Sequence, residues 1–242
     1  MLSRARVILK DTTHPGNIGA TARAMKTMGL GRLYLAAPRT LIDSQSRALS
    51  AGALDILANA VICDNVSEAL VDCTHVFAYT ARRRDLAPPL IDAQAAGQKA
   101  AMALNAGGEV ALLFGGERSG LNNDDARLAS FIVQIPANPE YSSMNLSQAT
   151  QIAVYELRKF LLSSHPPANT GLPNMPTQKQ LAALAEHAQT VLAKINMPKR
   201  GDGRLFLSRL LRIIKRAQPE SSEVRLLRGL LKAVENAVKN KE

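Results

Sequence analysis

The chain has 242 residues, of which 46% are hydrophobic and 4% aromatic, and it carries a formal net charge of +10. This length and hydrophobic content fit one large domain, or a medium domain joined to a small one. No apolar run approaches the roughly 20 residues of a membrane span, and the N-terminus lacks the apolar region of a secretory signal. We therefore expect a soluble cytoplasmic protein, with too few aromatic residues and no Trp for base stacking to dominate nucleic-acid binding.

The cysteines and histidines give no sign of a disulfide or a metal site. Cys63 and Cys73 are expected to be reduced core residues, because a cytoplasmic protein rarely holds a disulfide. None of the four histidines has a Cys or His at the spacing of metal ligands, so we expect no metal. The chemistry of this protein must then come from other residue types.

Short apolar runs alternate with stretches of helical pattern along the first two thirds of the chain. The apolar runs predict strands at 6–11, 33–37, 60–64, 75–81, 109–115 and 131–136. The helical patterns lie near 17–29, 44–53, 66–72, 92–105 and 146–162. Regular alternation of strand and helix predicts an α/β domain with a mainly parallel sheet flanked by helices.

The last third of the chain has a different pattern. Residues 163–176 contain four of the chain's twelve prolines, which is typical of a linker. Thr177 then caps a predicted helix with apolar residues at the 3.6-residue period, and two further helices are predicted at 203–217 and 221–239. Residues 177–242 should therefore form a small all-helical module.

Basic charge is concentrated in this module. Residues 177–242 hold 14 lysines and arginines against six acidic residues, a net charge of +8, whereas residues 1–176 hold 16 against 14, a net charge of +2. Such a distribution favours a polyanionic partner, although a solvated basic face that only aids solubility would look the same. The candidate RNA-binding side chains are Arg200, Arg204, Arg209, Arg212 and Arg216, with a second group, Arg82, Arg83 and Arg84, in a loop that could equally be a solvated one.

Three turns rich in Gly, Ser and Asn follow predicted strands, at 13–30, 114–125 and 135–156. None of them is an ordinary nucleotide-binding loop. The first strand is not followed by G-x-G-x-x-G, and Gly115 and Gly120 have P-loop spacing without the Lys-Ser/Thr that would follow them. The excess of polar residues nevertheless indicates a site at the carboxyl ends of the strands.

In this order and spacing the three turns resemble the SpoU branch of the SPOUT superfamily of RNA methyltransferases. The first motif is matched by Asn17 and Arg23, and the third by Ser143 and Asn145 before a helix. The second is a strand ending in FG-x-E-x-x-G-L, matched by Phe114, Gly115, Glu117, Gly120 and Leu121. HPGNIGATARAMKTMGL, ANPEYSSMNL and QPESSEVRLLRGLL extend the resemblance to the TrmJ type, the tRNA 2′-O-methyltransferases that act on nucleotide 32 of the anticodon loop.

The resemblance implies a fold, a reaction and partners. The sheet would contain a deep trefoil knot near its C-terminal edge, an exception to unknotted topology. S-adenosylmethionine would be the cofactor, with no metal, and tRNA, rather than DNA or a membrane, would be the partner of a homodimer. Residues 1–162 would be the methyltransferase domain with the cofactor site, 163–176 the linker and 177–242 the tRNA-binding module.

The resemblance also implies which residues hold the cofactor. They are Tyr79, Thr80, Ala81, Gly115, Ile135, Ser142, Ser143 and Met144. Simple turn geometry is the alternative for Gly115, and N-capping of the following helix is the alternative for the two serines. Tyr141 and Tyr155 are interpreted as packing residues.

Methyl transfer to a ribose 2′-OH requires alignment of the oxygen with the methyl carbon and removal of a proton from a poor acid. The resemblance gives Arg23 as the residue that activates the hydroxyl. A guanidinium is essentially always protonated, so Arg23 is either an unusually perturbed base, a stabiliser of the developing alkoxide or a clamp on the adjacent phosphate, and we favour the last two together. Glu117 and Asn17 would orient Arg23 or its neighbours, Asn145 would hold the third turn, and a plain surface arginine is the alternative for Arg23.

Two other functions compete with this hypothesis. A non-catalytic RNA-binding protein that kept the knot should have lost a motif residue, whereas all five catalytic candidates are present: Asn17, Arg23, Glu117, Ser143 and Asn145. A ribosomal RNA 2′-O-methyltransferase commonly carries an N-terminal RNA-binding extension, whereas here the first predicted strand begins by residue 6. The sequence leaves open the base preference at the target nucleotide, the set of tRNAs and the geometry of the dimer.

Overall fold

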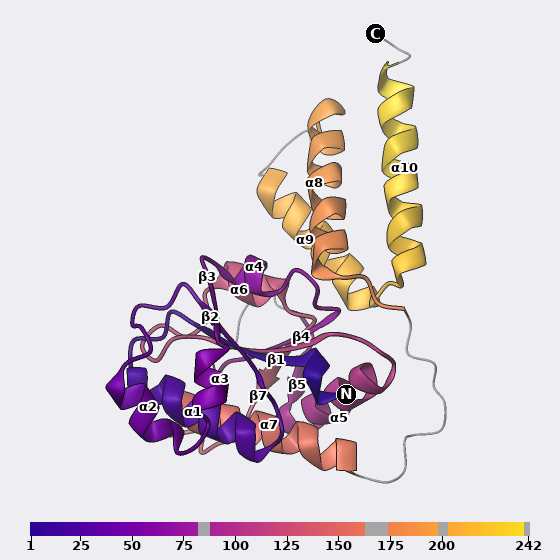
Figure 1. Ribbon diagram of the computed structural model, residues 1–242. Coiled ribbons are helices and arrows are strands. Elements are labelled where there is room, and N and C mark those ends of the chain that lie inside the picture. Colours follow the sequence, from indigo (N-terminus) through magenta and orange to yellow (C-terminus); the bar gives the residue numbers. More distant parts are fainter. Residues whose placement is uncertain (82–87, 163–173, 198–202, 240–242) are drawn as a thin grey trace. The chain divides into compact units, whose positions relative to one another are not determined.

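A computed structural model describes residues 1–81, 88–162, 174–197 and 203–239 (Figure 1). The chain divides into two compact units, Met1–Leu172 and Pro173–Glu242. Each unit is described by itself below. The first carries the three turns of the predicted site, and the second carries the basic helices.

The described part of the first unit contains a seven-stranded sheet in the order β3-β2-β1-β6-β4-β7-β5. Every neighbouring pair of strands is parallel, which confirms the predicted α/β class. From β1 to β7 the strands are Ala5–Lys10, Arg32–Ala36, Val61–Cys63, His75–Tyr79, Leu90–Asp92, Val110–Phe114 and Phe131–Gln134. Six of them were predicted. The prediction missed β5, a three-residue edge strand that directly follows two prolines and has no alternating pattern.

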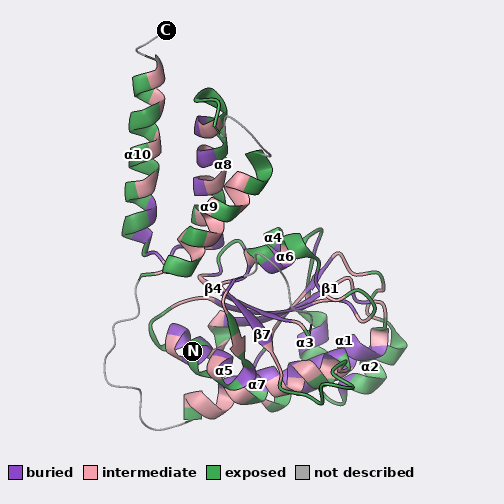
Figure 2. Cartoon of the chain, turned by 180° about the vertical axis from the view of Figure 1, so that it is seen from behind, coloured by how far each residue is buried: buried purple, intermediate pink, exposed green. Residues whose placement is uncertain are grey.

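Helices cover both faces of the sheet. One face is covered by α1 (Pro15–Thr27), α3 (Leu54–Ala58), α5 (Ala93–Asn105) and α7 (Leu146–Leu162). The other face is covered by α4 (Val66–Ala69) and α6 (Asn123–Leu128). The short α2 (Ser44–Ser50) packs against α1, and a 3-10 helix, η1 (Leu2–Arg4), precedes β1. The sheet is thus the middle layer of three, and Figure 2 shows its strands buried between helices that are buried along one side only.

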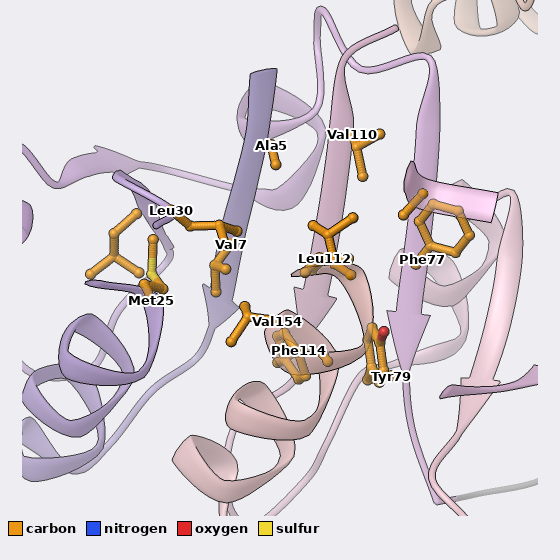
Figure 3. Packing of buried hydrophobic residues seen from close by; sticks show 14 of the residues in the cluster. Ala5, Val7, Met25, Leu30, Phe77, Tyr79, Val110, Leu112, Phe114 and Val154 are labelled. Carbon is orange, nitrogen blue, oxygen red and sulfur yellow. The ribbon is translucent and has the colours of Figure 1, made fainter. Parts of the chain in front are cut away.

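The side chains of the strands alternate between two hydrophobic clusters. Leu112 and Phe114 of β6 belong to the cluster beneath α7, and Leu113 between them belongs to the cluster beneath α4 and α6. Figure 3 shows Val7, Leu112 and Phe114 on the face that Val154 of α7 covers. Because successive residues of a strand point to opposite faces, a strand covered on both sides needs an unbroken apolar run, which is the pattern that predicted it.

The second unit contains the three predicted helices, α8 (Gln178–Lys194), α9 (Gly203–Ala217) and α10 (Ser221–Lys239). The Thr177 hydroxyl accepts a hydrogen bond from the backbone N–H of Gln180, and the side-chain oxygen of Gln180 accepts one from the backbone N–H of Thr177. The predicted cap is therefore confirmed as a capping box. The residues of α8 at one helical face, Leu184, Ala188 and Val191, are buried, and α8 packs against α10. An ion pair between Lys194 and Glu235 joins the same two helices.

Candidate functional site

The three polar turns meet at the carboxyl edge of the sheet. They follow β1, β6 and β7, and parallel strands end at the same edge. In the strand order β6 lies directly beside β1, and only β4 separates β6 from β7. Turns that are more than 100 residues apart in the sequence are therefore neighbours in space, at the edge where α/β proteins bind their ligands.

Glu117, in the turn after β6, binds the turn after β1. One carboxylate oxygen accepts hydrogen bonds from the backbone N–H and the hydroxyl of Thr13, at 3.0 and 2.9 Å. The other oxygen accepts from the side-chain amide of Asn17 at 2.8 Å and from the backbone N–H of His14 at 3.4 Å. A single carboxylate thus fixes the start of α1 against the second turn.

Asn145 connects the third turn to the same network. Its side-chain N–H donates to the amide oxygen of Asn17 at 3.0 Å. Its own amide oxygen accepts from the backbone N–H and the hydroxyl of Ser147, at 2.9 and 2.7 Å, at the start of α7. The capping function proposed as the alternative for Ser142 and Ser143 therefore belongs to Asn145, and both serines are exposed.

These hydrogen bonds determine the charge of Glu117. Burial alone would raise the pKa of its carboxyl group, but the donors from Asn17 and Thr13 outweigh burial and hold the pKa below its ordinary value. Among the described residues, no Lys or Arg forms an ion pair with Glu117. The network therefore keeps the carboxylate of Glu117 ionised, without an ion-pair partner in the described part of the chain.

The turn after β6 can form only with glycine. A Cβ atom on Gly115 would lie 2.1 Å from the carbonyl carbon of Gly120 and 2.2 Å from the amide nitrogen of Leu121. Gly120 itself has a positive φ of 62°, which favours glycine. Turn geometry thus explains both glycines, and both also line a cavity next to the turn.

A cavity of about 390 Å³ opens between the segments that follow β4, β6 and β7. All eight residues expected to hold the cofactor line it, namely Tyr79, Thr80, Ala81, Gly115, Ile135, Ser142, Ser143 and Met144. Glu117 and Asn145 of the hydrogen-bond network line it as well. The structure thus brings together, around one cavity, residues from three separate parts of the sequence.

Tyr79 and Phe114 form an apolar part of the lining. Their rings stack with centroids 4.7 Å apart, and both side chains are almost fully buried. Burial raises the pKa of Tyr79 above its ordinary value, so the phenol stays neutral. The part of these rings that reaches the cavity makes its wall apolar there, which suits a ring such as adenine.

Arg23 is not part of this cavity. It lies on α1 with its side chain exposed, and no described residue forms a hydrogen bond or ion pair with it. Glu117 binds Asn17, Thr13 and His14 instead, so the structure does not bring Glu117 and Arg23 together. The expected role of Glu117 in orienting Arg23 or its neighbours stays a prediction.

Comparison with known proteins identifies the chain. Residues 4–155 match the model of the SpoU rRNA Methylase family, and residues 179–242 match that of the tRNA methyltransferase TrmJ, C-terminal domain. The chain belongs to the SpoU methylase family. A relative from Sodalis glossinidius (strain morsitans), named tRNA (cytidine/uridine-2'-O-)-methyltransferase TrmJ, is 44% identical over 241 residues, 99% of this chain and 94% of its own length.

Solved structures of SpoU methylases share the fold. The crystal structure of TrmJ from Z. mobilis ZM4 has a TM-score of 0.81 and 32% identity, and the match covers 96% of this chain and 99% of that one. The AdoMet-bound rRNA methyltransferase from Sinorhizobium meliloti matches with a TM-score of 0.51 and 23% identity, over 66% of this chain and 57% of that chain. The second likeness concerns the fold alone.

The predicted RNA-binding arginines of this SpoU methylase have two different outcomes. Arg82, Arg83, Arg84 and Arg200 lie outside the described residues. The others lie on α9, where Arg204, Arg209 and Arg216 are exposed and Arg212 is half-buried.

None of the described helices is long and apolar enough to cross a membrane.

Sequence reasoning missed three residues of the site. Thr13 gives Glu117 two hydrogen bonds, and a Thr two residues before Pro15, in the polar segment after the first predicted strand, was a usable signal. Arg118 and Tyr141 line the cavity. The interpretation of Tyr141 and Tyr155 as packing residues was wrong, because their side chains are 78% and 51% exposed.

Proposed function

We propose that this SpoU methylase transfers the methyl group of S-adenosylmethionine to a ribose 2′-hydroxyl of tRNA, at nucleotide 32 of the anticodon loop. The observation that carries the proposal is the cavity lined by the second and third motif turns and by the end of β4, with Glu117 and Asn145 of its lining hydrogen-bonded to Asn17 of the first motif. The relative from Sodalis glossinidius, similar over nearly its whole length, supports tRNA as the substrate and cytidine or uridine as the methylated nucleoside.

The residues around the cavity fit S-adenosylmethionine. The stacked rings of Tyr79 and Phe114 provide an apolar surface for the adenine, and the hydroxyls of Ser142 and Ser143 provide hydrogen-bonding groups nearby. Glu117 supplies a carboxylate that no described cation neutralises, and this favours a ligand with a positive charge. When bound, S-adenosylmethionine supplies a methyl group already activated by its sulfonium.

The residues of the chain then act by position and charge. The network of Glu117, Asn17 and Asn145 holds the three turns, so that the ribose oxygen and the methyl carbon can be aligned. Arg23 binds the phosphate next to the ribose with its planar fork and stabilises the developing alkoxide, while the hydroxyl proton passes to phosphate or water. No base among the protein side chains is required.

A homodimer completes the site in this proposal. Arg23 lies outside the cavity of its own chain, on an exposed part of α1, which supports its delivery to the cavity of a second copy. Mixing Arg23→Ala subunits with Gly115→Val subunits, in which only the cavity is blocked, should restore part of the activity that each variant alone lacks. A fully active monomer in solution would contradict the arrangement.

We also propose that the fold contains the deep trefoil knot. The last strand, β7, lies between β4 and β5, two strands that precede it and are joined to each other by residues 80–89. The chain continues into α7, which packs against both α1 and α5. A segment that enters the gap between two strands already connected supports a threaded path, unlike the ordinary open sheet.

The basic helical unit is proposed to bind the body of the tRNA. Its net charge of +8 and the arginines of α9 support this. Affinity for tRNA should fall steeply with salt, and neutralising Arg204, Arg209 or Arg216 singly to Gln should lower the slope by about one unit or less. If tRNA affinity and its salt slope are unchanged in all three variants, these arginines do not contact tRNA phosphates.

The direct test is methylation of tRNA in vitro with isotope-labelled S-adenosylmethionine, followed by mass mapping of the labelled nucleotide. We expect label on the ribose of nucleotide 32, and loss of that label in an Asn145→Ala variant. Ribosomal RNA fragments serve as the competing substrate. Label in ribosomal RNA alone would support the ribosomal alternative, and RNA binding without label would support the non-catalytic one.

A further inference from the structure

Tyr141 is the most exposed large hydrophobic side chain among the described residues, at 78%, and yet it lines the cavity. An aromatic ring in that position lies at the rim, with one part against the cavity and the rest in solvent. A ring that is this exposed buries little apolar surface against other residues. Packing within the chain therefore does not explain Tyr141. The chain contains only four tyrosines and no Trp, which makes its placement at the rim more notable.

The backbone holds Tyr141 in place. Its N–H donates to the carbonyl oxygen of Asn138 at 3.0 Å, and the N–H of Glu140 donates to the side-chain oxygen of Asn138 at 3.1 Å. Four residues later Asn145 is bound to Asn17. The segment that presents the ring is therefore tied down at both ends, which lowers the entropy cost of binding a ligand there.

Arg118 contributes a cation to the same cavity from a different turn. Its side chain is exposed, and no described residue forms a hydrogen bond or ion pair with it. The neighbouring Glu117 makes four hydrogen bonds that fix the turn. The guanidinium of Arg118 thus starts from a fixed point of the backbone and remains available to a ligand.

A ring and a guanidinium at one cavity mouth match the two parts of a nucleotide. Aromatic side chains stack on the face of an unpaired base, and the planar fork of arginine suits a phosphate. S-adenosylmethionine has no phosphate, and the carboxylate of its methionine part is its single anionic group. The RNA strand, in contrast, offers a base and a phosphate at each nucleotide.

We propose that Tyr141 and Arg118 hold the nucleotide that is methylated: Tyr141 stacks on its base, and Arg118 binds a phosphate next to it. The inference rests on the proposed function and adds the recognition of the target nucleotide to it. Every base has a π face, so this contact tolerates both cytidine and uridine. Stacking here is a single contact at the target, and it is compatible with a chain that contains few aromatic residues overall.

The test compares five variants with the wild-type chain in steady-state methylation of a whole tRNA. Tyr141→Leu should raise KM for tRNA about tenfold, since stacking of one base contributes enough to binding for such a change. Tyr141→Phe keeps the ring and should remain within about twofold of wild type. Tyr155→Leu is the matched control, because Tyr155 is also exposed but does not line the cavity.

Arg118→Gln should weaken tRNA binding and lower the salt slope by about one unit, as expected for one lost phosphate contact. Arg127→Gln is its control: Arg127 is an exposed arginine of α6 that pairs with Asp124. The affinity for S-adenosylmethionine, measured by calorimetry, should stay within about twofold of wild type in every variant. Thermal unfolding of each variant separates a binding defect from a folding defect.

Two results would overturn the inference. If Tyr141→Leu leaves KM for tRNA unchanged, Tyr141 does not stack on a base of the RNA. If the same variant loses affinity for S-adenosylmethionine while its tRNA affinity is unchanged, the ring contacts the cofactor instead. Either result is distinct from failure of the proposed function. That failure would appear in the wild-type chain, as the absence of methyl transfer to any tRNA.

Discussion

The two edges of the sheet each contain a polar cluster centred on one glutamate, and the clusters do different things. At the amino edge Glu109 accepts hydrogen bonds from Arg6 at 3.2 Å and Arg32 at 2.6 Å. At the carboxyl edge Glu117 accepts from the neutral groups of Thr13, His14 and Asn17. At the amino edge the glutamate is paired with positively charged side chains, and at the carboxyl edge it is held by neutral donors.

The partners explain the difference. Arg6 is almost fully buried, donates to the carbonyl of Ala69 at 2.9 Å and lies 4.8 Å above the ring of Tyr34, so its charge requires Glu109. The donors to Glu117 come from the turn after β1 and from the first turn of α1, about 100 residues away in the sequence, and they hold these segments beside the turn after β6. The amino-edge cluster therefore serves folding, and the carboxyl-edge cluster positions turns around a cavity. Substitutions at four positions can break or sharpen this contrast.

The largest effect is expected at Arg23, on α1 and outside the cavity of its own chain. Arg23→Ala should lower methyl transfer by about 10²–10³-fold, because it removes stabilisation of developing charge, while the unfolding temperature stays unchanged. Arg23→Lys should fail similarly, since an ammonium cannot reproduce the planar fork. Single-turnover rates measure this, and a Lys variant within a few-fold of wild type would contradict the bidentate role.

Glu117→Gln should lower activity by about 100-fold, because a glutamine amide cannot accept all four hydrogen bonds and the turns move out of alignment. Since the native pKa of Glu117 is depressed, its contribution to stability is present above the ordinary value of 4.5 and is lost as pH falls below it. The stability difference between variant and wild type, measured by urea unfolding, should therefore shrink in acid. If the variant keeps full activity but loses much stability, Glu117 serves folding, as Glu109 does at the amino edge.

Glu109→Gln should show the opposite balance. It leaves the charge of Arg6 buried without a counter-ion, which we expect to lower the free energy of unfolding by about 3 kcal/mol. The specific activity of the folded fraction should match wild type, because Glu109 lies at the edge away from the cavity. Reduced activity per folded molecule would show that the two edges are coupled.

The smallest effect concerns His75, at the amino end of β4. Burial, with a smaller contribution from Lys99, lowers its pKa from 6.5 to about 4, so the folded protein holds this imidazole neutral. The unfolded chain binds the proton first, and stability should fall by about 1–2 kcal/mol between pH 6.5 and pH 5. Unfolding curves of the wild-type chain and of His75→Gln, measured at both pH values, test this. The variant should lack this part of the pH dependence of stability. An equal pH dependence in both proteins would show that another group causes it.

Local pattern was sufficient for most of the elements. The helix predicted at 146–162 is α7 with the same bounds, and α9 and α10 also begin and end where expected. The prediction missed α3 and α6, helices of five and six residues, because one turn and a half is too short for a period to show. Strong periodicity and polar caps are properties of neighbouring residues, which a sequence displays directly.

The sequence by itself thus determined the α/β class, the basic helical unit and, through its resemblance to a known family, the residues that line the cavity. Only the tertiary structure decided which of them bind one another. The Asn17–Glu117 and Asn17–Asn145 hydrogen bonds join residues 100 and 128 positions apart, and no local pattern specifies such pairs. The exposure of Tyr141 and the distance of Arg23 from the cavity were hidden for the same reason, because burial depends on which distant segments pack around a side chain.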